Sequence, residues 1–236
     1  MHISQKETSR AGFTRMELIL IAFVMVMLLG FLLPQMIRKM KHSAQLSACA
    51  ANLKELAIAE IIYMEEHNLF GFLPRQHSTN EGGTMEYLQN RDLVQHFKCF
   101  TNGLTTPKVL LCPSDDRASA GSFWTLGNSN LSYFVNRDAG RVSGTGAIPL
   151  DSRDCRLTVA VGDRNVSSSA GQQRGVMIVD RNQELGWSFT MHNKAKRRSQ
   201  PLLGNVAFTD ASVISLTPPK LKEAPDYPGA SCLVLP

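Results

Sequence analysis

The chain has 236 residues, of which 43% are hydrophobic and 19% charged, and its formal net charge is +5. This length accommodates one membrane helix and one globular domain of middling size, large enough to build a core without disulfide or metal staples. The small net charge excludes a nucleic-acid-binding class, because the basic residues are scattered apart from a cluster at 194–198 that has no interleaved aromatic residue. We expect that cluster to be a solvated loop.

A short hydrophilic segment opens the chain, ends in Gly12 and precedes an uninterrupted apolar run at residues 18–33. Residues 16–37, read as a helix, would extend about 30 Å, which is one hydrocarbon thickness. A buried helix of a soluble domain would show a polar stripe, and this run shows none on any face. We therefore predict a leader at 1–12 and a membrane-spanning helix at 13–37.

One carboxylate, Glu17, stands at the start of the apolar run. An ionised group near hydrocarbon costs several kcal/mol, so an acid at this place indicates function and needs a partner. Cleavage after Gly12 would create that partner, because the new α-amino group of Phe13 would lie about one helical turn from Glu17. The two charges would then neutralise each other within or between subunits.

This arrangement resembles the signal of type IV prepilins and type II secretion pseudopilins. Gly12 ends the leader, Phe13 matches the first mature residue, Glu17 falls at the acidic position, and Pro34 falls where pilin helices carry a proline. The resemblance implies that a prepilin peptidase cleaves after Gly12 and methylates the amino group of Phe13, and that the apolar helices bundle into a filament core. Arg15 departs from the pattern, and its charge must reach the headgroups or pair with Glu17.

Two other interpretations of this segment are weaker. A cleaved signal peptide expects a small-x-small site just past the apolar run, and the nearest candidate, at 48–50, is too far away. A lipoprotein signal at 46–49 is separated from the run by Arg38, Lys39, Lys41 and His42. An uncleaved signal anchor stays open. The cleavage motif favours a cytoplasmic amino terminus, although the basic cluster after the run, taken alone, argues against it.

The helix is expected to continue beyond the membrane as an amphipathic segment at residues 38–70. Apolar residues recur there at three- and four-residue spacing, with charged residues on the other side. Gly71 and Pro74 should end the helix. Pro34 removes a backbone donor, which predicts a bend or a tolerated kink.

The remainder should form an α+β, pilin-like head at residues 71–216. We expect irregular structure up to 107 with a short helix over 85–97, and then short β-favouring runs bounded by turn residues. These runs lie at 109–111, 123–126, 131–135, 157–161, 176–179, 187–190, 206–208 and 213–216. An antiparallel sheet packed on the long helix follows. The Pro-rich tail, 217–236, should lie extended on the surface or be mobile.

Several further segments, in this order, resemble a bacterial pseudopilin-like family with a carboxy-terminal histidine-to-Asp-Gly signature. They are the segments at 52–54, 112–115, 132–136, 162–165, 191–193 and 204–213. In that signature His192 and Asp210 would be structural turn residues, and Ala211 replaces the usual glycine, which would strain a turn that needs positive φ. Proteins of this type often carry cysteines at the places of Cys49 and Cys112, so the resemblance implies a bridge between them.

Cysteine spacing by itself leaves the pairing open. The chain has five cysteines, and the odd count leaves at least one unpaired or shared between chains. No two have the close spacing of a zinc site, which argues against metal–thiolate chemistry. The aspartates at 115, 116, 151, 154, 163 and 180 offer oxygen ligands for calcium. Without an Asp-x-Asp-x-Asp loop, solvated turns account for them better, so we expect no metal and no cofactor.

The chain is not expected to be an enzyme. His192, Asp163 and Asp210 with a serine would suit a hydrolytic triad, but no nucleophile motif accompanies them. We expect a structural subunit of a type II secretion pseudopilus or type IV pilus-like filament, which assembles with itself or other pseudopilins. Its partners would be a prepilin peptidase, an inner-membrane assembly platform and the lipid bilayer. It would sit in the bacterial inner membrane by a single pass, with the head in the periplasm. The alternative is a membrane-anchored periplasmic binding or sensory domain on an uncleaved anchor.

Overall fold

The computed structural model describes residues 14–69, 72–142, 146–147, 158–168, 175–179, 185–188, 190–191, 202–217 and 231–236. The leader and Phe13 lie outside these residues. The chain divides into two compact units, Met1–Ser43 and Ala44–Pro236.

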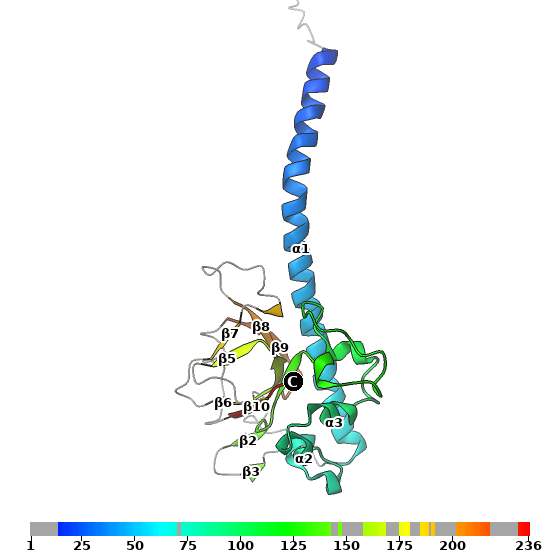
Figure 1. Ribbon diagram of the computed structural model, residues 1–236, viewed down its shortest axis with the longest axis vertical. Helices are drawn as coiled ribbons and strands as arrows, with labels where there is room; N and C mark the ends of the chain where they lie inside the picture. The colour runs from blue at the N-terminus through cyan, green and yellow to red at the C-terminus, as the bar shows by residue number, and fades with distance from the viewer. Residues whose placement is uncertain are drawn as a thin grey trace, which may run out of the picture. The chain divides into compact units, whose positions relative to one another are not determined.

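The first unit contains the amino-terminal part of helix α1 (Arg15–Glu66; Figure 1). Its apolar side chains from Met16 to Met40 are between 47% and 77% exposed. By length and composition this is one helix that could span a membrane, as predicted. The helix continues through Pro34, which lies inside it. Among the described residues of this unit none covers the apolar surface, which is therefore available to lipid or to other helices.

Helix α1 ends at Glu66, before Gly71 and Pro74 as predicted, and Asn68 terminates it. Asn68 adopts a left-handed conformation with φ of 52°. Its amide donates to the carbonyl of Glu65 at 3.2 Å, and the amide of Leu69 donates to that of Met64 at 3.0 Å. These two bonds form a Schellman motif, in which asparagine is the usual substitute for glycine. Leu69 is buried directly after it, which fixes the exit of the chain.

The segment after α1 is built from several short helices, where only one, over 85–97, was predicted in otherwise irregular structure. They are η1 (Pro74–Gln76), η2 (Thr79–Glu81), α2 (Met85–Gln89), α3 (Leu93–Lys98), η3 (Pro107–Leu110) and η4 (Asn128–Asn130). The predicted helix over 85–97 is broken between α2 and α3 at Arg91, whose φ is 63°. The predicted strand at 109–111 is wrong. Thr106 caps the amide of Lys108 and Pro107 occupies the first helical turn, so the chain enters η3 instead. The predicted strand at 123–126 is also wrong, since that segment forms turns.

An antiparallel six-stranded sheet, in the order β6-β10-β1-β4-β8-β9, organises the second unit. Its strands are β1 (Tyr133–Asn136), β4 (Val159–Asp163), β6 (Val176–Val179), β8 (Gly204–Phe208), β9 (Val213–Leu216) and β10 (Ser231–Val234). Two small sheets accompany it. One pairs β2 (Arg141–Val142) with β3 (Gly146–Ala147), and the other pairs β5 (Val166–Ser168) with β7 (Leu185–Trp187). The α+β class with an antiparallel sheet is therefore confirmed.

The expectation for the carboxy-terminal tail is wrong at its last residues. β10 lies inside the sheet, where Val234 pairs with Val135 of β1 and with Val176 of β6. Leu233 and Val234 are fully buried. The head therefore extends to the end of the chain rather than to residue 216, because these two apolar side chains fill opposite faces of the sheet.

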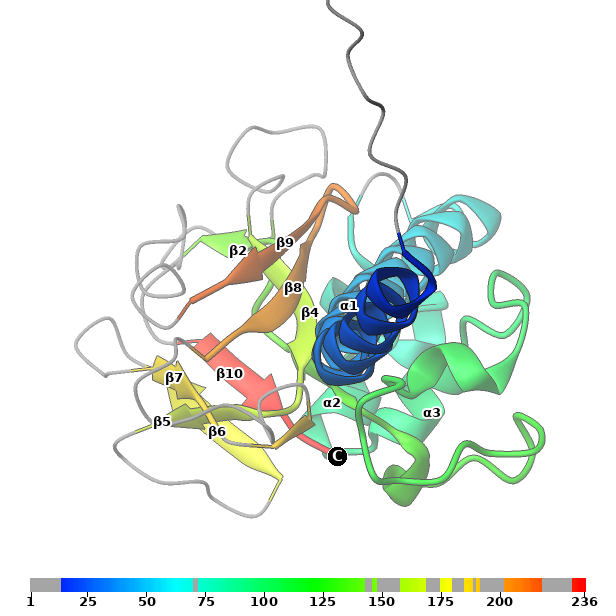
Figure 2. The ribbon, with the colours of Figure 1, turned by 90° about the horizontal axis from the view of Figure 1, so that it is seen from above.

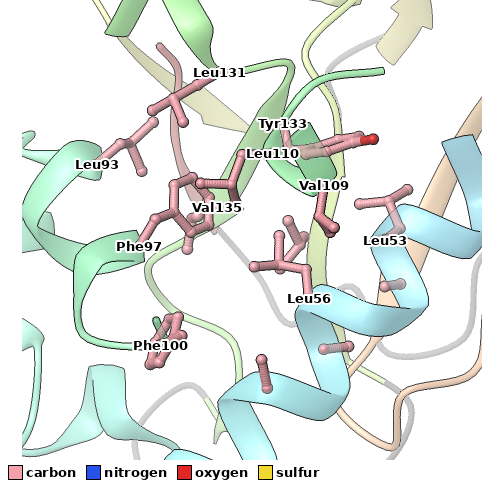
Figure 3. Close-up of a cluster of buried hydrophobic side chains, with 14 of the residues drawn as sticks. Leu53, Leu56, Leu93, Phe97, Phe100, Val109, Leu110, Leu131, Tyr133 and Val135 are labelled. Atoms are coloured by element: carbon pink, nitrogen blue, oxygen red, sulfur yellow. The ribbon is translucent and has the colours of Figure 1, made fainter. Parts of the chain in front are cut away.

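The sheet is buried on both faces, which divides the core into two clusters. Tyr133, Val135, Val161 and Ala207 face α1 and the short helices, and they belong to the larger cluster (Figure 3). The alternate residues belong to the second cluster; they include Phe134, Val206 and Phe208. Val159 also belongs to it, although it is two positions from Val161, because the register of β4 shifts between these two residues. Figure 2 shows α2 and α3 on the same side of the sheet as α1, with β5 and β7 on the other. Strand alternation thus assigns each side chain to one layer.

Candidate functional site

The predicted processing region is described from Thr14 onward, so the cleavage residues Gly12 and Phe13 lie outside the described residues. Thr14 and Glu17 form a capping box at the start of α1. The amide of Thr14 donates to Glu17 Oε2 at 2.8 Å, and the amide of Glu17 donates to Thr14 Oγ1 at 3.3 Å. Each side chain satisfies a helix amide that has no partner within the helix.

This capping box gives Glu17 a local partner that does not require cleavage. The sequence signal was available, because a threonine followed three residues later by glutamate is a known helix start. Our sequence analysis missed it by considering only the amino group of Phe13. A helix start and an intersubunit contact are therefore compatible roles for the same side chain.

A second cluster of functional groups is buried between the second unit's part of α1 and the sheet. It consists of Cys49 on α1, Cys112 after η3 and Asp163 at the end of β4, and all three are completely buried. The two sulfur atoms and a carboxylate oxygen lie within 4.8 Å of one another. Cys49 Sγ lies 3.0 Å from Asp163 Oδ1 and 3.5 Å from the hydroxyl of Tyr133. We call these four residues the Cys–Asp cluster.

Each member of the Cys–Asp cluster is held from another part of the fold. Tyr133 and Asp163 are register partners across β1 and β4. The amide of Asn205 on β8 donates to Asp163 Oδ2 at 2.6 Å, which orients the carboxylate. Four chain segments thus meet at one buried point.

The segment that carries Cys112 is held by α1 on both sides of Cys49. The side-chain amide of Gln45 donates to the carbonyl of Pro113 at 3.3 Å, and that of Asn52 donates to the carbonyl of Leu111 at 3.0 Å. These two contacts bracket Cys112 and bring its sulfur to that of Cys49. They also explain why Asn52 belongs among the motif residues.

Burial determines the protonation of this cluster. It raises the pKa of the Cys49 thiol far above its ordinary value, and hydrogen bonding with Cys112 and the charge of Asp163 add to the effect. Burial likewise raises the pKa of Tyr133 well above its ordinary value, and the neighbouring Cys49 adds to it. Both groups therefore keep their protons. Cys49 can then donate its thiol proton to Asp163.

The bridge implied by the resemblance is not formed in the structure. Cys49 and Cys112 lie side by side, but no disulfide joins them. Their proximity could not be derived from spacing, because 63 residues separate them in the sequence (112 − 49). Of the other cysteines, Cys99 is a free, partly buried thiol, and Cys155 lies outside the described residues.

Residues from three of the sequence motifs, at 112–115, 132–136 and 162–165, contact one another around one ion pair. Arg164, next to Asp163, donates to Asp115 from Nε at 2.7 Å and from Nη2 at 2.6 Å, and the hydroxyl of Ser132 donates to the same carboxylate at 2.8 Å. Burial raises the pKa of Asp115, but these hydrogen bonds outweigh it and hold the pKa below its ordinary value. Asp115 is therefore the anion of a structural ion pair with Arg164.

The hairpin between β8 and β9 contains Asp210 and Ala211. Asp210 Oδ1 accepts the amide of Ser212 at 2.8 Å, as expected of a turn residue. Ala211 has φ of 61°, and its amide donates to the carbonyl of Phe208 at 3.0 Å. This is a three-residue loop with a type I turn and a left-handed last position, where glycine is ordinarily preferred. Ala211 therefore occupies a conformation that alanine adopts only with strain.

No hydrolytic triad is assembled from the described candidates. Asp163 lies beside Asn205 near the start of β8, and Asp210 follows the end of the same strand. The length of the strand separates the two carboxylates. His192, the third candidate and a predicted turn residue, lies outside the described residues, as do Asp151, Asp154 and Asp180.

No known protein-family model matches this chain, and no curated protein and no solved structure is significantly similar to it.

Proposed function

We propose that the chain is a pilin-like structural subunit. It is made with a leader, trimmed after Gly12, methylated at Phe13 and assembled through α1 into a pseudopilus or pilus-like filament. The observation that carries the proposal is the combination at the start of α1. Glu17 is a carboxylate in the first turn of α1, and the large apolar side chains of this helix from Met16 to Met40 are all exposed. An apolar surface of this length needs lipid before assembly and neighbouring helices after it.

In this mechanism Glu17 sets the register between neighbouring subunits. An unpaired carboxylate inside an apolar helix bundle penalises every alignment except the one that brings a cation to it. The amino group of Phe13 in an adjacent subunit is that cation. The capping bond from the amide of Thr14 occupies one oxygen of the carboxylate, and the other oxygen serves the neighbour.

Two substitutions at Glu17 separate register from capping. Glutamine at the third helical position also accepts the capping bond, so Glu17→Gln keeps the helix start and removes only the charge. Glu17→Ala removes both. In cells with the native assembly machinery, we expect both variants to enter the membrane and both to yield far fewer filaments than the wild type, counted by electron microscopy. Normal filament yield from Glu17→Gln together with loss in Glu17→Ala would restrict Glu17 to capping, and normal yield from both would refute the assembly role.

The capping box also favours a second candidate, an uncleaved anchor that carries a periplasmic binding or sensory domain. Because Thr14 already serves the carboxylate, this anchor would be stable in the membrane with its leader attached. Mass spectrometry of protein recovered from a host with a prepilin peptidase decides between the two. A first residue of Phe13 with a methylated amine supports the pilin-like subunit. An intact Met1 and strictly monomeric protein support the anchor.

A further inference from the structure

We propose that Cys49, Cys112 and Asp163 form a buried binding site for one thiophilic divalent ion of the Zn²⁺ type. The proposal does not depend on filament assembly. It rests on three side chains with ligand atoms, contributed by α1, the segment after η3 and the end of β4, whose ligand atoms all lie within 4.8 Å of one another. Two thiolates and a carboxylate are a ligand set that Zn²⁺ accepts.

The distances in the cluster suit a tetrahedral ion. With bonds of about 2.3 Å to sulfur and 2.0 Å to oxygen, the edges of a zinc tetrahedron measure about 3.5–3.8 Å. The three ligand atoms already fall within 4.8 Å. The 3.0 Å contact between Cys49 Sγ and Asp163 Oδ1 is shorter than such an edge. Replacing the shared proton by the ion would lengthen it by about half an ångström.

Asp163 favours an ion over a disulfide at this place. In the structure its Oδ1 faces the thiol of Cys49, which has a proton to donate. A disulfide carries no proton, so oxidation would remove the hydrogen bond that Cys49 donates to this buried oxygen. A divalent ion instead gives the carboxylate a positive partner. The chemistry is balanced, because the ion displaces the two thiol protons to solvent and no electron is transferred.

Neighbouring groups would hold the ligands in place. The amide of Asn205 orients Asp163 through Oδ2. The hydroxyl of Tyr133, at 3.5 Å from Cys49 Sγ, can donate to the thiolate or complete the coordination. The amide of Ser114 lies 3.5 Å from Cys112 Sγ and can donate to it. Hydrogen bonds of this kind stabilise thiolate charge and fix ligand orientation. The ion would join α1 to the sheet and to the segment between them.

The test uses the full chain, purified in detergent under reducing, metal-free conditions and titrated with Zn²⁺ or Co²⁺. We expect about one tightly bound ion per chain. The cobalt form should show an intense sulfur-to-metal charge-transfer band, which reports thiolate ligation in the wild type without any substitution. Cys112→Ser should abolish the band, and Asp163→Asn should weaken binding at least tenfold. Cys99→Ser, Cys155→Ser and Cys232→Ser, made singly, should leave stoichiometry and spectrum unchanged.

Three results would overturn the proposal. The first is a wild-type chain that binds no ion while its far-ultraviolet circular dichroism shows it to be folded. The second is binding that survives in Cys112→Ser but is lost in one of the three control variants. The third is a Cys49–Cys112 disulfide, detected by peptide mapping of protein trapped directly from cells without reductant.

Discussion

His96 is a buried histidine that stays neutral. It lies on α3 and is completely buried, with Nδ1 3.0 Å from the hydroxyl of Thr84. Burial, and then the nearby guanidinium of Arg75, lower the pKa of His96 well below its ordinary value. Arg75 is itself held by Glu60, with Nε donating to Oε1 at 3.0 Å, and by the carbonyls of Asn136 and Ala160. His96 thus packs beside an ion pair whose positive member faces it, and protonation is doubly disfavoured.

This neutral histidine predicts a pH dependence of stability. The folded pKa lies below the unfolded value of about 6.5, so below that pH the unfolded chain binds a proton that the folded chain rejects. Stability is therefore lost as pH falls. Between pH 7.5 and 5.5 we expect the free energy of unfolding to drop by about 1.4 kcal/mol through His96 alone. Urea denaturation at both pH values, followed by the fluorescence of the buried Trp187, measures it.

The matched variant is His96→Asn, which keeps a polar partner for Thr84 but does not titrate in this range. It should be less stable than the wild type at pH 7.5, because it leaves a small cavity. Its free energy of unfolding should nevertheless change less between the two pH values, by the amount assigned to His96. An equal drop in both proteins would show that another group causes the pH dependence.

Among the strands of the head, the last one, β10, should contribute most to stability. β10 pairs with β1 on one side and β6 on the other, so it supplies hydrogen bonds to both neighbours. Leu233 packs in the second core cluster with Phe134 and Trp187. β10 follows a Pro-rich segment and has only four residues, so the sequence alone does not identify it as a strand. Its burial depends on the neighbouring strands β1 and β6.

Truncating a side chain in β10 should therefore be costly. Leu233→Ala removes a fully buried side chain, and we expect a loss of about 2–5 kcal/mol in the free energy of unfolding. Ile214→Ala, in the edge strand β9 and 41% exposed, should cost about 1 kcal/mol or less. Both are measured by urea denaturation in mild detergent. Equal small effects would mean that β10 contributes little to the folded head.

At the scale of the whole molecule, the chain combines two units with opposite requirements. The unit Met1–Ser43 exposes its apolar side chains, and the unit Ala44–Pro236 buries its own in two clusters. In the proposed function, insertion into the membrane depends on the first, and folding in water on the second. The proposed cleavage after Gly12 would change neither, so processing and membrane attachment should be separable.

Gly12→Asp tests that separation. A charged side chain at the cleavage site should leave the leader attached, so the recovered protein should be heavier by its twelve leader residues and should lack the methyl group. It should still resist extraction from membranes by alkaline carbonate, because residues 18–33 are unchanged. Ser9→Asp adds the same charge within the leader away from the bond and should be processed normally. Normal processing of Gly12→Asp would contradict cleavage at this site.

Features that depend on residues close together in the chain could be predicted from the sequence alone. The membrane-length helix follows from the run at 18–33, the buried face of its continuation from the spacing of Leu53, Leu56 and Ala57, and the antiparallel class from short alternating strands bounded by turns. The capping box of Thr14 and Glu17 is also a local pattern that can be predicted from the sequence. Each of these depends on residues within a few positions of one another, where backbone geometry is nearly independent of the rest.

Only the tertiary structure decided which distant residues meet. In the tertiary structure Glu60 is buried on the apolar face of α1, where Arg75 neutralises its charge. Strand β10 lies between β1 and β6. The fold also brought Cys49, Cys112 and Asp163 together from three segments. Such contacts join residues from 15 to 114 positions apart, and hydrophobic patterning records only which side of an element is buried, not what lies opposite.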